Sequence, residues 1–451
     1  MFETIKNCFK VKEIRKKMLI TLLLLFIFML GCYIPVPGIT ASTFSEEVKN
    51  NSFLGLLSSI TGGALQNATL FALGISPYIN ASIILQLLTV GIPALERLSK
   101  QGEEGRKKIA QITRYVTILL AVAQAIGIVV NFGLSSNSIK LSLFGHFTDG
   151  GISEVGAKWI AGIFLTVVYT AGAMLVMWIG ERITEYGISN GISLVIFTGI
   201  ISTAGLTIVQ NLIEGFQGEY SRFWELLGFV ILTLLEFVAI VAVDLSERRI
   251  PVQYAKQVKG RKMYGGQSSN IPMRISGSGV MPLIFAFALI SFPGMIISLT
   301  GSESANNGLT EWFSGQSPHW YVQLYYMVAL CLLIFAFSFF YQSMQFNPED
   351  VSKTIQQNGG FIQGIRPGKP TADYLRKISN RITLFGAIYL SLVAFIPSIL
   401  SMILSSIGIS NLSLLSVFST TGILIVVSVA LELHKQLESQ LMMKNYKGFL
   451  K

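Results

Sequence analysis

The sequence contains a series of apolar runs that are long enough to cross a lipid bilayer. The first begins near Met18, and further runs begin near Leu70, Arg114, Lys158, Asn190, Phe223, Ser276, Tyr321, Ile378 and Ser413. A membrane-spanning helix needs about 20 predominantly apolar residues, so these runs predict ten transmembrane helices. The composition agrees, because 51% of the residues are hydrophobic and only 13% are charged, against about 25% charged in soluble proteins.

The basic residues are distributed very unevenly between the segments that join these runs. Of the 34 Lys and Arg residues, all but Lys49, Lys140, Lys158 and Arg222 fall on one predicted side of the membrane. Cytoplasmic loops carry an excess of Lys and Arg, so both termini are predicted to be cytoplasmic. The first run is not followed by a small-residue cleavage site, and we expect a retained helix rather than a signal peptide.

Ten helices divide into two sets of five, and an odd number per set makes the two halves inverted relative to each other. We therefore divide the chain into an arm at 1–17, a first half at 18–212, a second half at 213–433 and a tail at 434–451. The arm and the tail are predicted to be cytoplasmic. The second half includes two cytoplasmic loops, at 246–275 and 344–377.

The second helix of each predicted half contains the same short motif. It reads Gly74-x-x-Pro77-x-Ile79 in the first half and Gly279-x-x-Pro282-x-Ile284 in the second. Glycine and proline loosen membrane helices where two repeats meet around a central path. A motif this short also arises by chance, so the sequence alone leaves its meaning open.

One apolar piece, Phe53 to Leu65, is too short to cross a bilayer. The predicted topology places both of its ends on the outer side. Backbone that enters a membrane without spanning it survives only inside protein or beside water. The piece therefore either folds into a protein cavity as a plug or lies flat at the interface, and the residues favour neither reading.

Few ionisable residues lie deep inside the predicted helices, and Glu236 is the clearest of them. An ion-coupled transporter would place several charged groups near the midplane. Isoleucines stand out instead: Ile79 and Ile83 are four residues apart and share a helix face, as do Ile192 and Ile196. Isoleucine on a membrane helix commonly faces lipid or packs against a neighbour, so these residues alone do not establish a site.

The three cysteines and three histidines are scattered along the chain. They match no redox or metal-binding spacing, and no nucleotide-binding, zinc-protease or serine-hydrolase motif appears. We therefore expect no enzymatic activity, no catalytic residue, no metal site and no cofactor.

Two of the predicted cytoplasmic loops are longer than topology requires. In the first, "RRIPVQYAKQ" and "NIPMRI" predict a two-stranded projection with Lys259, Arg261 and Lys262 at its tip. In the second, Arg366 precedes a Pro-Gly turn that holds its charge in solvent. Such tips suit a soluble partner or an RNA backbone, although basic loops also arise from topology alone.

Several motifs together resemble one family. They are "PVPGI", "GGALQNATLFALGISPYINASIILQLL", "EEGRKKIAQITRY", "ITEYGISNGISLVIF", "GIRPGKPTADYL" and "RITLFGAIYL". In this order they are similar to the bacterial SecY family, the channel subunits of the general secretion (Sec) translocon in the cytoplasmic membrane. The resemblance covers essentially the whole chain.

The resemblance implies an all-α polytopic membrane protein with ten transmembrane helices in two inverted five-helix halves around a central channel. It implies a plug at 53–68 that includes Phe53, Leu56, Leu57, Ile60, Gly62, Gly63 and Leu65. It implies a pore ring of Ile79, Ile83, Ile192, Ile196, Ile284 and Ile425, with Ile423 as an alternative for the last position. The implied lateral gate lies near Gln86 and Phe292, and the implied docking residues are Arg261, Lys262 and Arg366.

The implied function is a protein-conducting channel. Unfolded polypeptides would cross it, membrane segments would leave it sideways, and the apolar ring and plug would seal it at rest. The implied partners are SecE, SecG, the SecA motor ATPase, the ribosome, signal sequences, secretory polypeptides and the lipid bilayer. Two other readings remain, a ten-span secondary transporter and a structural membrane scaffold.

Overall fold

The computed structural model describes most of the chain. It covers residues 7–37, 61–130, 154–216, 220–254, 257–259, 262–264, 268–275, 281–299, 319–406 and 420–448, with residues 39, 45, 58, 279, 312 and 313.

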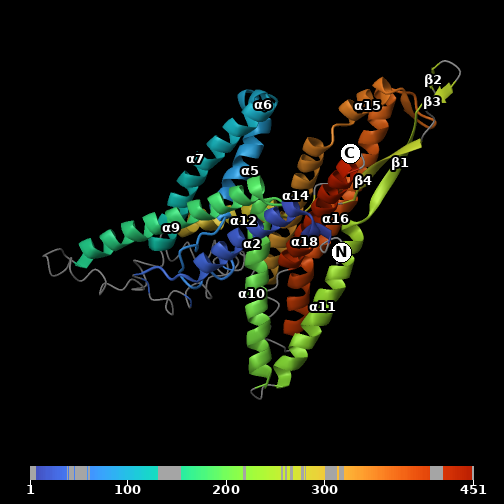
Figure 1. The fold of residues 1–451 in the computed structure, drawn as a ribbon. Helices are drawn as coiled ribbons and strands as arrows, with labels where there is room; N and C mark the ends of the chain where they lie inside the picture. The colour runs from blue at the N-terminus through green and yellow to red at the C-terminus, as the bar shows by residue number, and fades with distance from the viewer. Residues whose placement is uncertain are drawn as a thin grey trace.

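Long helices dominate the described residues, and their order follows the predicted apolar runs (Figure 1). They are α2 (Lys12–Tyr33), α5 (Ser76–Gly91), α7 (Glu103–Ile128), α9 (Glu154–Tyr186), α10 (Gly191–Phe216), α11 (Tyr220–Asp244), α12 (Met281–Leu299), α14 (Trp320–Gln345), α16 (Lys369–Ser406) and α18 (Thr420–Gly448). Two shorter helices, α6 (Pro93–Ser99) and α15 (Pro348–Gln357), lie beside them. The predicted all-α fold class is confirmed.

Among the described residues, five helices are long and apolar enough to cross a membrane by themselves. A sixth candidate combines α5 with α6, which are bent by 105° at the break between them. Helices α10 and α12 contain shorter apolar stretches, Gly191–Leu206 and Met281–Ile290. The order of the helices along the chain therefore agrees with the ten apolar runs. By length and composition alone, five or six of the described helices are candidate membrane spans.

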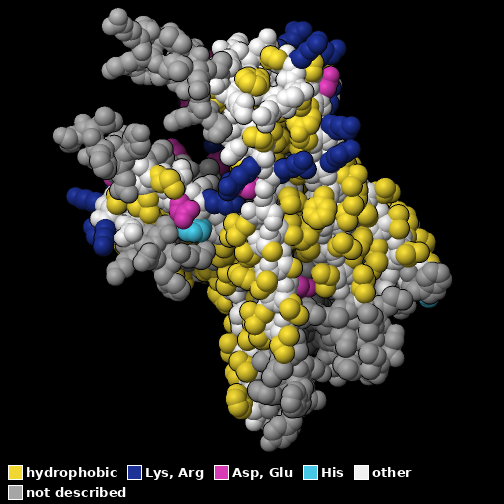
Figure 2. All heavy atoms as spheres, turned by 90° about the vertical axis from the view of Figure 1, so that its right-hand side faces the viewer, with side chains coloured by type: hydrophobic (Ala, Val, Ile, Leu, Met, Phe, Trp, Pro, Cys, Tyr) yellow, Lys and Arg dark blue, Asp and Glu magenta, His cyan; other side chains and the backbone are white. Residues whose placement is uncertain are grey.

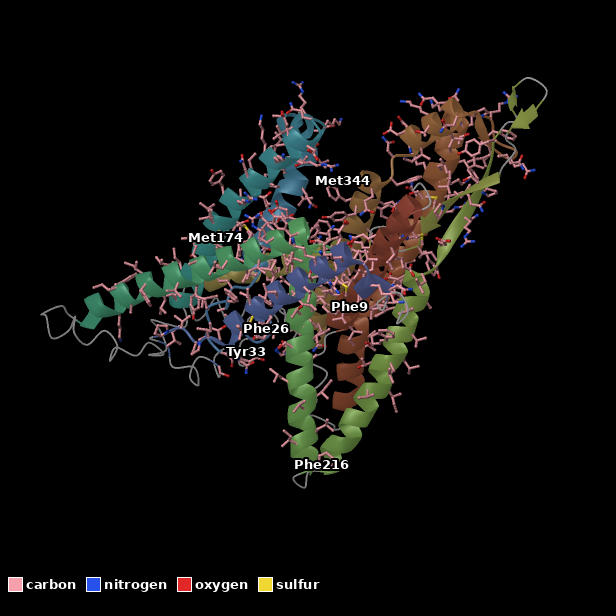
Figure 3. All side chains as sticks on the ribbon, viewed as in Figure 1. Phe9, Phe26, Tyr33, Met174, Phe216 and Met344 are labelled. Atoms are coloured by element: carbon pink, nitrogen blue, oxygen red, sulfur yellow. The ribbon has the colours of Figure 1, made fainter. Side chains whose placement is uncertain are left out.

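The helices carry apolar side chains on their outer faces as well as their inner ones. Helix α2 buries Leu24, Phe28 and Cys32 on one face, which follows the four-residue helical spacing. Its other face exposes residues such as Phe26 at 61% and Tyr33 at 52%, both labelled in Figure 3. A helix that is apolar all round suits a hydrocarbon solvent.

Helices α5 and α12 begin in the same way, and the repeated GxxPxI motif is the reason. Gly74 and Gly279 have φ values of +53° and +62°, a conformation that glycine adopts without the steric cost of a side chain. Each helix starts two residues later, and its second residue is the proline of the motif. Proline is tolerated in the first turn because that N–H has no helical partner.

This start also explains a difference from the sequence prediction. The second apolar run begins near Leu70, but α5 begins only at Ser76. The intervening residues form a series of turns. The apolar run therefore includes non-helical backbone that is held inside the protein.

Two of the large apolar cores each draw mainly on one stretch of the chain. One combines residues of α7, α9 and the turns before α5, and the other combines α12, α14, α16 and α18 with Ile83 of α5. The predicted halves contact each other at several places, including α10 against α18. Helices α10 and α11 run side by side as a hairpin in Figure 1, and α12 contacts α5 and α7.

The predicted two-stranded projection is confirmed. Strand β1 (Glu247–Tyr254) pairs antiparallel with β4 (Ser268–Arg274), in a register that places Ile250 opposite Ile271. A small hairpin of β2 (Gln257–Lys259) and β3 (Lys262–Tyr264) lies between them in sequence. The prediction omitted β5 (Gly360–Ile362), which joins the other edge of β1 and gives the order β4-β1-β5.

Segments predicted to be cytoplasmic are joined to one another by packing. Cys8 and Ile14 of the arm pack with Ile188, which follows α9, and with Leu437 of the tail. Burial lowers the pKa of Lys435 in the tail, and the neighbouring Arg274 guanidinium lowers it further. In Figure 2, Lys and Arg side chains gather in the upper part of the face shown, above a largely hydrophobic surface.

Candidate functional site

The six predicted ring isoleucines come from four helices and lie in two adjoining apolar clusters. Ile196 and Ile425 belong to the first cluster, and Ile79, Ile192 and Ile284 pack against it. Ile83 belongs to the second cluster, against which Ile79 and Ile284 also pack. Ile79 and Ile284 thus connect the clusters, and each is the fourth residue of its helix.

The alternative residue at the last ring position lies elsewhere. Ile425 belongs to the same apolar cluster as Ile196 of α10. Ile423 lies within the core of the predicted second half. Both side chains are buried, with 8% and 5% exposed, so burial alone does not distinguish them and the packing partners do.

The described end of the predicted plug is buried between the first of these clusters and the core of α7 and α9. Ala64 packs in the cluster of Ile196 and Ile425, whereas Leu65 packs in the core of α7 and α9. Both are almost completely inaccessible. Gly62 lies so close to α10 that a Cβ added to it would be 3.1 Å from the Cα of Gly199.

Hydrogen bonds tie this segment to its surroundings. The backbone N–H of Gly63 donates to the Ser58 carbonyl at 2.8 Å, and the Thr69 hydroxyl donates to the Ala64 carbonyl at 3.0 Å. The Val36 N–H donates to the Ala68 carbonyl at 3.1 Å. Internal partners for non-helical backbone are what a re-entrant segment requires.

Three of the seven predicted plug residues are described. Gly62 and Leu65 are buried and Gly63 is half-buried. The other predicted plug residues, Phe53, Leu56, Leu57 and Ile60, lie outside the described residues.

The two predicted gate residues lie on opposite sides of the contact between α5, α7 and α12. Phe292 of α12 packs against the first-half core that contains Leu65. Gln86 of α5 accepts a hydrogen bond from the Tyr341 hydroxyl of α14, and its amide donates to the Ser82 hydroxyl at 3.3 Å. The Tyr341 ring packs against Phe285 of α12, with centroids 5.1 Å apart.

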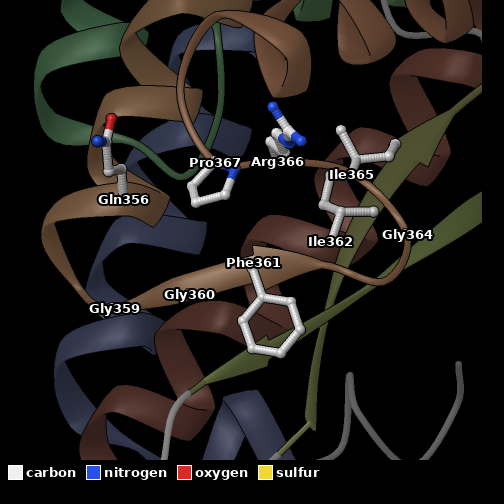
Figure 4. Close-up of a pocket in the computed structure, with 9 residues that line it drawn as sticks. All are labelled: Gln356, Gly359, Gly360, Phe361, Ile362, Gly364, Ile365, Arg366 and Pro367. Carbon is white, nitrogen blue, oxygen red and sulfur yellow. The ribbon is translucent and has the colours of Figure 1, made fainter.

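The three predicted docking residues are described to different extents. Arg261 lies outside the described residues, and Lys262 begins β3 at the tip of the projection. Arg366 is exposed on the turn after β5. It borders a pocket of about 530 Å³ lined by Gln356, Gly359, Gly360, Phe361, Ile362, Gly364, Ile365, Arg366 and Pro367 (Figure 4). The pocket places apolar side chains next to one cation.

Sequence reasoning missed the partners that hold these residues. Tyr341 carried no signal, because its contact with Gln86 joins residues 255 positions apart. Ser352 and Thr371, whose hydroxyls bond the Arg366 turn, stood in a polar loop among many similar residues. Their burial is decided only when α15 and α16 pack together.

Comparisons with a family profile and with individual relatives identify the same family. A profile of the SecY family matches residues 69–434. The chain is 41% identical over 464 aligned positions to the protein translocase subunit SecY of Streptomyces galbus, and the alignment covers 100% of both chains.

Solved structures with a similar fold are more distant in sequence. One is a SecY protein whose plug domain is described as stabilising the closed state of the translocation channel, with a TM-score of 0.63. Another is Sec61 in a canine ribosome-channel complex from the endoplasmic reticulum, with a TM-score of 0.61. Each is 19% identical, and the matches cover 94% of this chain and 92% of the other.

Proposed function

This chain belongs to the SecY family of protein translocase subunits, and from that premise we propose how its residues conduct and seal. The family consists of translocation channels and not of enzymes. The chain is a membrane-embedded channel subunit of this family. The proposal concerns which residues form the seal, the side exit and the docking surface.

The six ring isoleucines form a collar that closes the path at rest. The observation that carries this assignment is their convergence from α5, α10, α12 and α18 into connected apolar clusters. A narrow apolar constriction excludes water and ions by dewetting. Branched apolar side chains also offer no strong partner to a passing polypeptide, so an unfolded chain can move through without being held.

The plug provides a second seal from the outer side. Support comes from Ala64, which packs directly in the cluster of Ile196 and Ile425. The hydrogen bonds of residues 63–69 satisfy the backbone of this segment at that depth. A plug that is held by short-range turns and packing can leave as one unit when a polypeptide enters.

Membrane segments leave sideways between α5 and α7 on one side and α12 and α14 on the other. The Gln86–Tyr341 hydrogen bond crosses this seam. Interhelical hydrogen bonds in membranes contribute only about 0.6–2 kcal/mol, which suits a contact that must open. A signal sequence that binds only the parted state would shift the population toward opening.

The charged face is cytoplasmic in this proposal, and the protein lies in the bacterial cytoplasmic membrane with both termini inside. The arm, the tail and the turn after α9 pack together, which supports their placement on one side. SecE and SecG complete the complex. The SecA motor ATPase and the ribosome dock at the tips around Lys262 and Arg366, where basic side chains gain affinity for acidic or phosphate groups.

The collar assignment is tested by ion conductance of the purified complex in planar bilayers. Ile83→Gly and Ile196→Gly should each raise the resting leak severalfold, because they widen and wet the constriction. Ile84→Gly is the matched control on α5, and Ile201→Gly is the control on α10, where the side chain is 44% exposed. Neither control should change the leak.

Unchanged leak in the Ile83 and Ile196 variants would contradict the collar. If those variants instead abolished uptake of a small solute, a secondary transporter would explain the result better. The scaffold reading predicts that deleting residues 53–66 leaves permeability unchanged, whereas a plug predicts increased leak.

A further inference from the structure

The turn that carries Arg366 is held from behind by two buried hydroxyl groups. The Ser352 hydroxyl of α15 donates to the Gly368 carbonyl at 2.7 Å. The Thr371 hydroxyl of α16 donates to the Arg366 carbonyl at 2.8 Å. Only 3% of Ser352 and 1% of Thr371 is exposed, so these bonds are shielded from competing water.

Both bonds act on the backbone immediately around the exposed arginine. Pro367 restricts the preceding residue to extended conformations, and the Thr371 bond fixes the orientation of the peptide that joins Arg366 to Pro367. The Ser352 bond fixes the far end of the turn at Gly368. The direction in which the arginine leaves the backbone is therefore determined by two neighbouring helices.

A fixed turn matters for recognition because ordering a loop upon binding costs free energy. A loop that already has its bound shape avoids that cost. The same turn forms one wall of the pocket beside Arg366, with Gln356 of α15 opposite Pro367 in Figure 4. The hydroxyls thus position the cation and the adjoining pocket together.

We propose that Ser352 and Thr371 are positioning residues for docking, and that their buried hydroxyls present Arg366 in a preformed geometry to the SecA motor ATPase. This inference rests on the proposed docking role of Arg366. Neither hydroxyl touches the partner, because both side chains lie beneath the turn.

The test measures the affinity of purified SecA for the full chain, assembled with its partner subunits in nanodiscs. Thr371→Val and Ser352→Ala should each weaken binding about fivefold, as expected when one buried hydrogen bond is lost. Thr371→Ser keeps the hydroxyl and should restore binding. Thr354→Val is the matched control, since the hydroxyl of this exposed threonine donates within its own helix α15, to the Asp350 carbonyl at 2.8 Å.

A double-mutant cycle separates positioning from a general loss of stability. In an Arg366→Ala background, Thr371→Val should cause no further loss, because the group that it positions is absent. An equal loss in both backgrounds would overturn the inference, as would unchanged binding by Thr371→Val when Arg366→Ala weakens it. If Arg366→Ala itself leaves binding unchanged, the proposed docking role fails instead.

Discussion

Tyr341→Phe removes one hydroxyl from the seam between the two sides of the proposed gate. That hydroxyl donates to Gln86 across α5 and α14. The ring packs against Phe285 and is 8% exposed, and phenylalanine preserves this packing. The substitution therefore isolates the hydrogen bond from the aromatic contact.

The expected effect follows from the strength of interhelical hydrogen bonds in membranes. Measured values average about 0.6 kcal/mol and reach about 1.7 kcal/mol. If the bond exists only while the seam is closed, its loss favours the parted state by that amount. The ratio of open to closed channels should rise by a factor of about 3 to about 18.

The assay is the resting open probability of single channels in planar bilayers, without a translocating polypeptide. Tyr389→Phe is the control with the same chemical change. Its hydroxyl is buried in α16 and makes no hydrogen bond within the described part of the chain. This variant should leave the open probability unchanged.

The Gln86→Leu background tests whether the change in open probability comes from the Gln86–Tyr341 hydrogen bond. There the Tyr341 hydroxyl has already lost its acceptor, so Tyr341→Phe should add little. A full additional increase in that background would refute the reasoning, and so would an unchanged open probability for Tyr341→Phe alone.

Three further predictions test packing at other places. Gly74→Ala should lower thermal stability more than Gly279→Ala, because both residues have positive φ but only at Gly74 would an added Cβ meet a threonine methyl, at 2.5 Å; equal shifts in melting temperature would contradict the difference. Cysteines at Ala64 and Ile284, in a background without native cysteines, should crosslink in the idle channel, since both residues lie in one cluster, and no adduct on denaturing gels would count against a seated plug. Leu437→Ala should cost about 2–5 kcal/mol and loosen the packing of the arm on the tail, measured as faster protease cleavage of the arm than in Met442→Ala, where the side chain is 68% exposed.

Local patterns predicted the elements well because they depend on neighbouring residues. The apolar runs led to helices in the right order, since a backbone in hydrocarbon must bond within its own segment. Alternating Ile250 and Val252 led to β1. The repeated glycine-proline motif led to two helices that begin alike, because the dihedral limits of glycine and proline act within a few residues.

Other features required contacts between distant segments. Strand β5 is only three residues long, too short for a periodic signal, and it exists because β1 offers a free edge. The turns before α5 looked like the start of a helix, since an apolar run does not reveal where buried backbone finds its hydrogen-bond partners.

The sequence by itself determined a membrane protein, its basic face, its helices in order, and the family to which it belongs. Those properties follow from composition, spacing and motifs along one chain. Only the tertiary structure decided that Ile425 and not Ile423 joins Ile196, that Ala64 reaches the same cluster, and which hydroxyls hold Gln86 and Arg366. Each depends on the rotation and depth at which two helices pack, and the free energy of that choice is spread over side chains from distant parts of the chain.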